Sequence, residues 1–270
     1  MIRFSNYGKS RVRLAKVERD GGLHNFRELN VHIQFTGDYD DCYVSGDNSR
    51  ILPTDTMKNT VYALARTASL GAIESFGARL CEHFLRNNEY LRSVRVEIEE
   101  TTWSRLGAHS FQKGNEVRTT SVVDGASIVS GIKNLVLLNT TNSSFEGYIH
   151  DPYTTLKETS DRILGTAVEA SWHYEQGPHD FDALWHAIRA KLVEVFVGHT
   201  SPSVQSTLYA MGEAVLAAFP PVEDISLSLP NKHCLLVNLE PFGLDNPNEV
   251  FLPVDEPHGL IEATLSRGNQ

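Results

Sequence analysis

The sequence predicts an α+β protein of two tandem domains, each an antiparallel four-stranded sheet with a pair of helices on one face. Segments of alternating apolar and polar residues indicate strands, and apolar residues at helical spacing indicate helices. The order strand, strand, helix, helix, strand, strand occurs twice along the chain, which is typical of two copies of one plan. We expect the first domain to span residues 1–133 and the second to span residues 134–270.

The first half opens with two alternating segments. RVRLAKV (11–17) places Val12 and Leu14 on one face, and NVHIQF (30–35) has the same pattern, so both should be strands with one buried face. The polar residues between them suit a hairpin connection. Two helices with apolar faces should follow, and then two further strands. These helices are predicted at about 55–66 and 70–84, and these strands at 94–100 and 116–125.

The second half has the same order of elements. Strands are predicted at 132–140 and 163–174, and the first helix after them carries apolar residues from Phe181 to Val195 on one face. Ser203 or Ser201 is suited to cap the second helix. A strand should follow this helix, and we expect Pro230 to break it, because proline lacks the N–H group that pairing in a sheet requires. The last strand segments are predicted at 225–230, 234–239 and 259–267.

Composition and motifs exclude several classes of protein. The chain has 270 residues and a net charge of −10, and its 24 basic residues are scattered, so we expect no nucleic-acid partner. No apolar run approaches the ~20 residues of a membrane helix, and no signal peptide is expected at the start. The cysteines Cys42, Cys81 and Cys234 are far apart, which favours a reducing compartment. The eleven histidines form no ligand pair of metal-site spacing, so we expect no metal site. No phosphate-binding glycine loop occurs, which disfavours nucleotide binding through such a loop, and no hydrolase elbow supports a hydrolase.

Polar clusters remain where the predicted elements meet. YGK (7–9) precedes the first strand, PTDT (53–56) begins a helix, SPSVQST (201–207) begins another, and SLPNKH (228–233) lies at a strand. A fifth segment, from residue 142 to residue 164, is rich in hydroxyl groups and has little periodicity, and long irregular segments in compact domains are often functional. These five segments are therefore the places where we expect residues that bind a ligand.

The side chains in these segments suit a flat, polar, anionic heterocycle. An aromatic ring can stack on such a ligand, a guanidinium can grip it, amides can pair with its edge, and two helix N-termini can direct free N–H groups at it. The residues concerned are Lys9, Thr54, Asp55, Phe145, Arg162, Val204, Gln205, Asn231 and His233. Each of them also has an ordinary interpretation when it is taken alone. Thr54 and Asp55 are suited to cap a helix, and Lys9 alone would be a solvated lysine.

At these positions the chain resembles the urate oxidase (uricase) family. The segments YGK, PTDTMKNTVY, TNSSFEGY with YTTLKETSDRIL, SVQSTLY, SLPNKH, PFGLDNPNEVF and GLIEATLSR occur in the family's order over nearly the full chain. The resemblance implies the family's tandem T-fold (tunnelling fold). It also implies oxidation of urate by O2 and water to 5-hydroxyisourate and hydrogen peroxide without a cofactor. A homotetramer with active sites at subunit interfaces is implied as well.

The resemblance also implies a role for each candidate residue. Lys9, Thr54 and His233 would form a proton relay. Arg162 and Gln205 would grip urate in its plane, and Phe145 would stack on its ring. Backbone groups of Asp55 and Val204 would hydrogen-bond the edge of urate, and Asn231 would border, with Thr54, the place of O2 or water above the ring. The absence of a peroxisomal signal at the end, SRGNQ, points to a cytoplasmic enzyme of bacterial type.

An alternative is a non-catalytic T-fold protein that binds a purine or a pterin. Loss of Lys9 or Thr54 would have favoured it, and both residues are present. Other enzymes that share this fold act on pterins with zinc or a catalytic histidine set, for which the spacing is missing here. An assay for urate consumption separates these possibilities.

Overall fold

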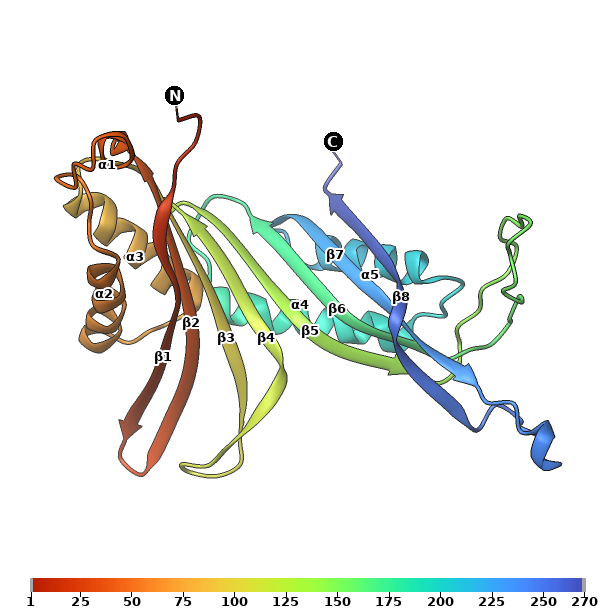
Figure 1. Ribbon diagram of the computed structural model, residues 1–270. Coiled ribbons are helices and arrows are strands. Elements are labelled where there is room, and N and C mark those ends of the chain that lie inside the picture. Colours follow the sequence, from red (N-terminus) through yellow and green to blue (C-terminus); the bar gives the residue numbers. More distant parts are fainter. Residues whose placement is uncertain (1, 269–270) are drawn as a thin grey trace. The chain divides into compact units, whose positions relative to one another are not determined.

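The computed structural model describes residues 2–268 and divides into two compact units (Figure 1). Unit 1 comprises the chain through Ile132 together with His173–Ala183, and unit 2 comprises Lys133–Trp172 and the chain from Leu184 onward. The domain limits 1–133 and 134–270 stay a prediction.

Unit 1 is built on an antiparallel sheet in which consecutive strands are neighbours. The sheet and the helices on one of its faces have the predicted order of two strands, two helices and two strands (Figure 1). A short helix, α1 (Asp40–Val44), follows the second strand. The strands are β1 (Tyr7–Asp20), β2 (Leu23–Gly37), β3 (Leu91–Arg105) and β4 (Phe111–Val123), and the helices are α2 (Thr54–Thr67) and α3 (Ile73–Asn87).

The core of unit 1 lies between this sheet and its two helices. Every second residue of β2 from Leu29 to Phe35 is buried, as the alternation predicts, and α2 contributes Met57 and Val61 at helical spacing. A side chain at Gly77 of α3 would lie 2.8 Å from the side chain of Val122, so α3 packs closely on β4 at this point. Each large apolar side chain that is fully buried contributes about 1.5–3 kcal/mol to folding. Burial on one face thus fixes which side of β1 and β2 carries the helices.

Unit 2 has the same plan, with β5–β6–β7–β8 as successive neighbours and β7 antiparallel to β8. Helix α5 packs on β7 and β8. A single turn of 3-10 helix, η1 (Glu240–Phe242), lies between the last two strands. The strands are β5 (Ser127–Asn139), β6 (Leu164–Tyr174), β7 (Val222–Leu236) and β8 (Phe251–Ser266), and the helices are α4 (Phe181–Gly198) and α5 (Val204–Ala218).

The prediction that Pro230 breaks its strand was wrong. Strand β7 continues through Pro230, which pairs with Leu260 of β8. The irregularity comes immediately afterwards, as a register shift between Asn231 and His233. A proline is tolerated beside such an irregularity, because the regular ladder is interrupted there in any case.

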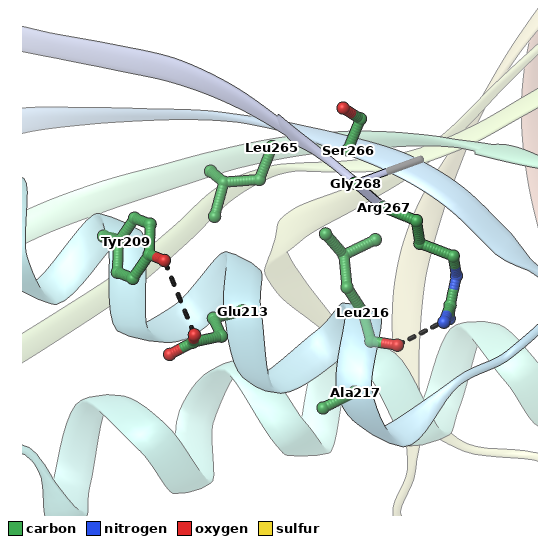
Figure 2. A pocket seen from close by; sticks show the side chains of 8 residues that line it. All are labelled: Tyr209, Glu213, Leu216, Ala217, Leu265, Ser266, Arg267 and Gly268. Carbon is green, nitrogen blue, oxygen red and sulfur yellow. Dashed lines mark hydrogen bonds between the residues drawn. The ribbon is translucent and has the colours of Figure 1, made fainter. Parts of the chain in front are cut away.

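The end of α5 is capped by Arg267, the last residue of the predicted segment 259–267. Its Nη2 donates to the carbonyl oxygens of Leu216 at 2.5 Å and Phe219 at 2.9 Å, and its Nε donates to the carbonyl oxygen of Val222 at 2.9 Å. Figure 2 shows Arg267 beside Leu216. A cation at a helix C-terminus satisfies free carbonyl groups and interacts favourably with the helix dipole.

We therefore expect Arg267→Met to lower the free energy of unfolding by about 1–2 kcal/mol, since the hydrogen bonds of a charged group are lost. The measurement is thermal unfolding at fixed protein concentration. Arg86→Met is the control, because Arg86 lies in the last turn of α3 and forms an exposed ion pair with Glu82. Exposed ion pairs contribute little, so the control should unfold close to the wild type. Equal effects of the two variants would contradict a capping role for Arg267.

Among the helices of residues 2–268, none is both long enough and apolar enough to cross a membrane.

Candidate active site

Lys9 lies beside a β-bulge in β1. Lys9 pairs with Ile33 and Val12 pairs with Val31, so Ser10 and Arg11 together face a single residue of β2. Arg11 has a φ of 57°, the left-handed conformation that such a bulge allows. Directly paired residues of antiparallel strands point to the same face, and Ile33 is fully buried in the core. The Lys9 side chain therefore leaves the sheet on the face that carries the helices.

Thr54 and Asp55 are the first two residues of α2, and the prediction that they cap this helix was wrong. The N-cap residue is Pro53, with an extended ψ of 136°, and no side chain makes a capping hydrogen bond. The helix begins one residue earlier than a threonine cap would require. The Thr54 hydroxyl has no hydrogen-bond partner within residues 2–268, so it is available for another role.

The Asp55 carboxylate is occupied by its own helix. It accepts hydrogen bonds from the Lys58 ammonium and, at 3.0 Å, from the Asn59 amide. The Lys58 ammonium lowers the pKa of Asp55 below its usual range, and the positive charge of Lys9 adds a smaller effect in the same direction. Lys9 therefore lies close enough to the start of α2 for its charge to interact with the Asp55 carboxylate. The N–H groups of Thr54 and Asp55 precede the first hydrogen bond of the helix, from Met57 N–H to the Pro53 carbonyl, and are available to a ligand.

In unit 2, Phe145 and Arg162 are held together by the irregular segment that contains both. The Phe145 N–H donates to the Thr159 carbonyl at 2.8 Å, and the Arg162 N–H donates to the Ser143 carbonyl at 2.8 Å. The Arg162 guanidinium lies over the Phe145 ring, 5.2 Å from its centre. Its Nε is buried without a hydrogen-bond partner, and burial lowers the pKa of Arg162. A buried, unpaired guanidinium edge beside an aromatic face suits an anionic planar ligand.

The same segment is joined to the start of α5, where Val204 and Gln205 lie. The Ser144 N–H donates to the Ser201 carbonyl at 2.8 Å, within a short parallel bridge between Ser143 and Ser201. Ser203 caps α5, as predicted, and its hydroxyl oxygen accepts from the N–H of the third helical residue at 3.1 Å. The structure thus brings Phe145 and Arg162 to the N-terminus of α5.

Asn231 and His233 flank the register shift of β7. A side chain at Gly165, three residues after Arg162, would lie 3.3 Å from the carbonyl oxygen of Lys232. The beginning of β6 therefore lies directly against this irregular part of β7. Lys9, Thr54 and Asp55 belong to unit 1, whereas the other six candidates belong to unit 2.

Two aromatic residues beside the candidates were missed by the sequence analysis. Tyr148 stacks on Phe145 with ring centres 4.8 Å apart and planes 14° apart, and His150 stacks in turn on Tyr148 at 5.0 Å. The Tyr148 hydroxyl donates to the Leu156 carbonyl at 2.8 Å, which fixes this stack to its loop. The second residue is Tyr7, which precedes Lys9 by two residues. Tyr7 and Tyr148 each lie in one of the five polar segments, but no periodicity in these segments indicates the contacts of the two rings.

Two pockets, one in each unit, are bordered by none of the nine candidate residues. In unit 2, α5 and the end of β8 border a pocket of about 700 Å³, which contains none of the predicted site residues (Figure 2). In unit 1, a pocket of about 390 Å³ is bordered by Tyr7, Leu52 and the end of α3. Within residues 2–268, no three His, Cys, Asp or Glu side chains are grouped as metal ligands.

Known proteins and one family model match this chain over nearly its whole length. The family model described as Uricase matches residues 5–127 and 128–262. A uricase of Arthrobacter globiformis is 44% identical over 269 residues, which cover 97% of this chain and 89% of that protein. A uricase of Oryctolagus cuniculus is 39% identical over 97% of this chain and 93% of its own length. The crystal structure of the Arthrobacter globiformis uricase superimposes with a TM-score of 0.96 at 42% identity, covering 100% of this chain and 96% of that one. The predicted tandem T-fold is thereby confirmed, and the chain belongs to the uricase family.

Proposed function

We propose that this chain is a urate oxidase, which converts urate, O2 and water to 5-hydroxyisourate and hydrogen peroxide. Two electrons pass from urate to O2, and water supplies the hydroxyl group that the product gains. An electron-rich urate anion can donate to O2 directly, so the reaction as proposed requires no cofactor. The observation that carries the proposal is the Arg162 guanidinium over Phe145 at the start of α5, whose Nε is buried without a hydrogen-bond partner.

Unit 2 would supply the grip on urate. Arg162 and Gln205 would hold the ligand in its plane, and Phe145 would stack on its ring. The free N–H of Val204, in the first turn of α5, would donate to an oxygen at the edge of the anion. These groups hold urate flat and deprotonated, which favours electron loss.

Unit 1 would supply most of the proton transfer. Lys9 would exchange protons through the Thr54 hydroxyl, and His233 would complete the relay from the other unit. The backbone N–H of Asp55 would also hydrogen-bond the edge of urate. Asn231 and Thr54 would border the place of O2 and water. General acid–base catalysis of this kind typically accelerates a reaction by ~10²–10⁴-fold.

We further propose a homotetramer in which each site combines unit 1 groups of one subunit with unit 2 groups of its neighbour. Large apolar side chains are exposed on β5, β7 and β8, and a second copy would cover such surfaces. They include Val136, Leu138, Leu235, Leu252 and Leu260. We also propose a cytoplasmic location, which suits the free thiols of Cys42, Cys81 and Cys234.

The experiment follows the loss of urate absorbance and the release of peroxide by the purified protein. We expect turnover that persists after exhaustive chelation and without added flavin, with peroxide equal to urate consumed. Urate that binds without being consumed would favour the non-catalytic purine-binding alternative. Activity that is lost on chelation and restored by one metal would contradict the cofactor-free reaction.

A further inference from the structure

A hydrogen bond in unit 1 connects the segments that carry Lys9 and Thr54. The Leu52 N–H donates to the Tyr7 hydroxyl oxygen at 3.0 Å. Tyr7 precedes Lys9 by two residues on β1, and Leu52 precedes Thr54 by two residues before α2. The bond therefore joins the strand to the helix entry close to both residues.

The Tyr7 ring is fixed by an aromatic cluster. It meets Tyr39 edge-on at 4.9 Å and Phe35 edge-on at 5.7 Å, and the Tyr39 hydroxyl donates to the Phe35 carbonyl at 2.7 Å. Burial raises the pKa of Tyr7, so its hydroxyl stays neutral. A ring held on two sides has little freedom to move, and its oxygen therefore marks a defined position for Leu52.

The strand that carries Tyr7 and Lys9 is also fixed. A side chain at Gly8 would lie 1.8 Å from the carbonyl oxygen of Ile33, so the β1 backbone lies directly against β2 between the two residues. On the other side of Lys9, the Ser10 hydroxyl and His32 Nδ1 are 2.9 Å apart across the bulge. The segment 7–10 is thus a rigid frame, and Tyr7 is its contact with the segment that leads to Thr54.

We propose that Tyr7 is a positioning residue, which holds Thr54 at the distance from Lys9 that proton transfer requires. This inference rests on the proposed function. Tyr7 acts through the backbone of Leu52. Small displacements of reacting groups are costly, because a misplacement of 1 Å can lower a rate by about 10²-fold. A hydroxyl that only filled space in the core would leave turnover unchanged.

The test is Tyr7→Phe, which keeps the ring and removes the hydrogen bond to Leu52. We expect kcat to fall about tenfold, with the KM for urate within about twofold of wild type. Tyr39→Phe is the matched control, because it removes a hydroxyl from the same cluster without touching Leu52. We expect it to lower thermal stability as much as Tyr7→Phe does while kcat stays within about twofold of wild type.

A second comparison distinguishes positioning from an independent effect. In a Lys9→Met background, the Tyr7→Phe substitution should have no further effect on kcat, because the relay that it serves is already lost. A multiplied loss in that background, or equal kcat values for Tyr7→Phe and Tyr39→Phe, would overturn the inference. A wild-type protein that does not oxidise urate would instead overturn the proposed function, so the two failures are distinguishable.

Discussion

Replacement of Thr54 by alanine should lower kcat by about 10²-fold or more while urate still binds. The reason is that its hydroxyl has no partner within residues 2–268 and makes no capping bond, since α2 starts from Pro53. The same variant should therefore unfold close to the wild-type temperature, without the loss of about 0.5–2 kcal/mol expected for a lost cap. Steady-state kinetics and thermal unfolding measure the two effects separately.

The control is Thr54→Ser, which retains the hydroxyl and should keep substantial activity. Lys9→Met should cause a loss similar to that of Thr54→Ala, and the double variant should be barely worse than the worse single variant. Fully multiplicative losses would show that Lys9 and Thr54 act independently. A folded Thr54→Ala protein with nearly normal kcat would remove Thr54 from the relay.

Mixing two inactive variants should restore activity. Lys9→Met damages the unit 1 half of the site, and Arg162→Ala damages the unit 2 half. If each site combines halves from different subunits, random mixing restores about a quarter of the sites, because each half has an even chance of being intact. The mixture is prepared by subunit exchange or co-expression, and its kcat is compared with that of each variant alone.

Two controls make this result interpretable. Mixed oligomers are verified by a size tag on one variant, and Thr54→Ala is mixed with Lys9→Met, where both changes lie in unit 1. The second mixture should remain inactive, because no site can then receive an intact unit 1 half unless the wild-type chain is present. Verified exchange without recovery in the first mixture would contradict a site shared between subunits.

Periodicity predicted most of the fold. Helix α2 and helix α3 follow from apolar spacing, and the alternation in β2 predicts its buried face, because burial on one side of an element leaves a regular signal. The cap of α2 was assigned wrongly, since threonine and aspartate are both common caps and aspartate is also favourable in the first turn of a helix. Pro230 likewise favours a strand end in general, but the adjacent bulge admits it.

The site residues were found by resemblance, and their geometry was not predictable from the sequence. Phe145 and Arg162 are separated by 16 residues without periodicity, and only the backbone bonds to Thr159 and Ser143 bring them together. The Tyr7–Leu52 hydrogen bond joins two segments 45 residues apart. Tertiary contacts of irregular segments leave no local signal, because they depend on how distant elements pack.

The two residues of β1 that face one residue of β2 also determine which changes of length this strand tolerates. Loss of either Ser10 or Arg11 would leave a regular strand in which every paired residue keeps its side of the sheet. Loss of one residue between Val12 and Val17 would reverse the parity of the strand and turn Lys9 toward the opposite face. A single-residue deletion in this strand that keeps the Lys9 side chain on its face of the sheet is therefore confined to Ser10 and Arg11. An alignment gap placed elsewhere in the strand would assign Lys9 to the opposite face.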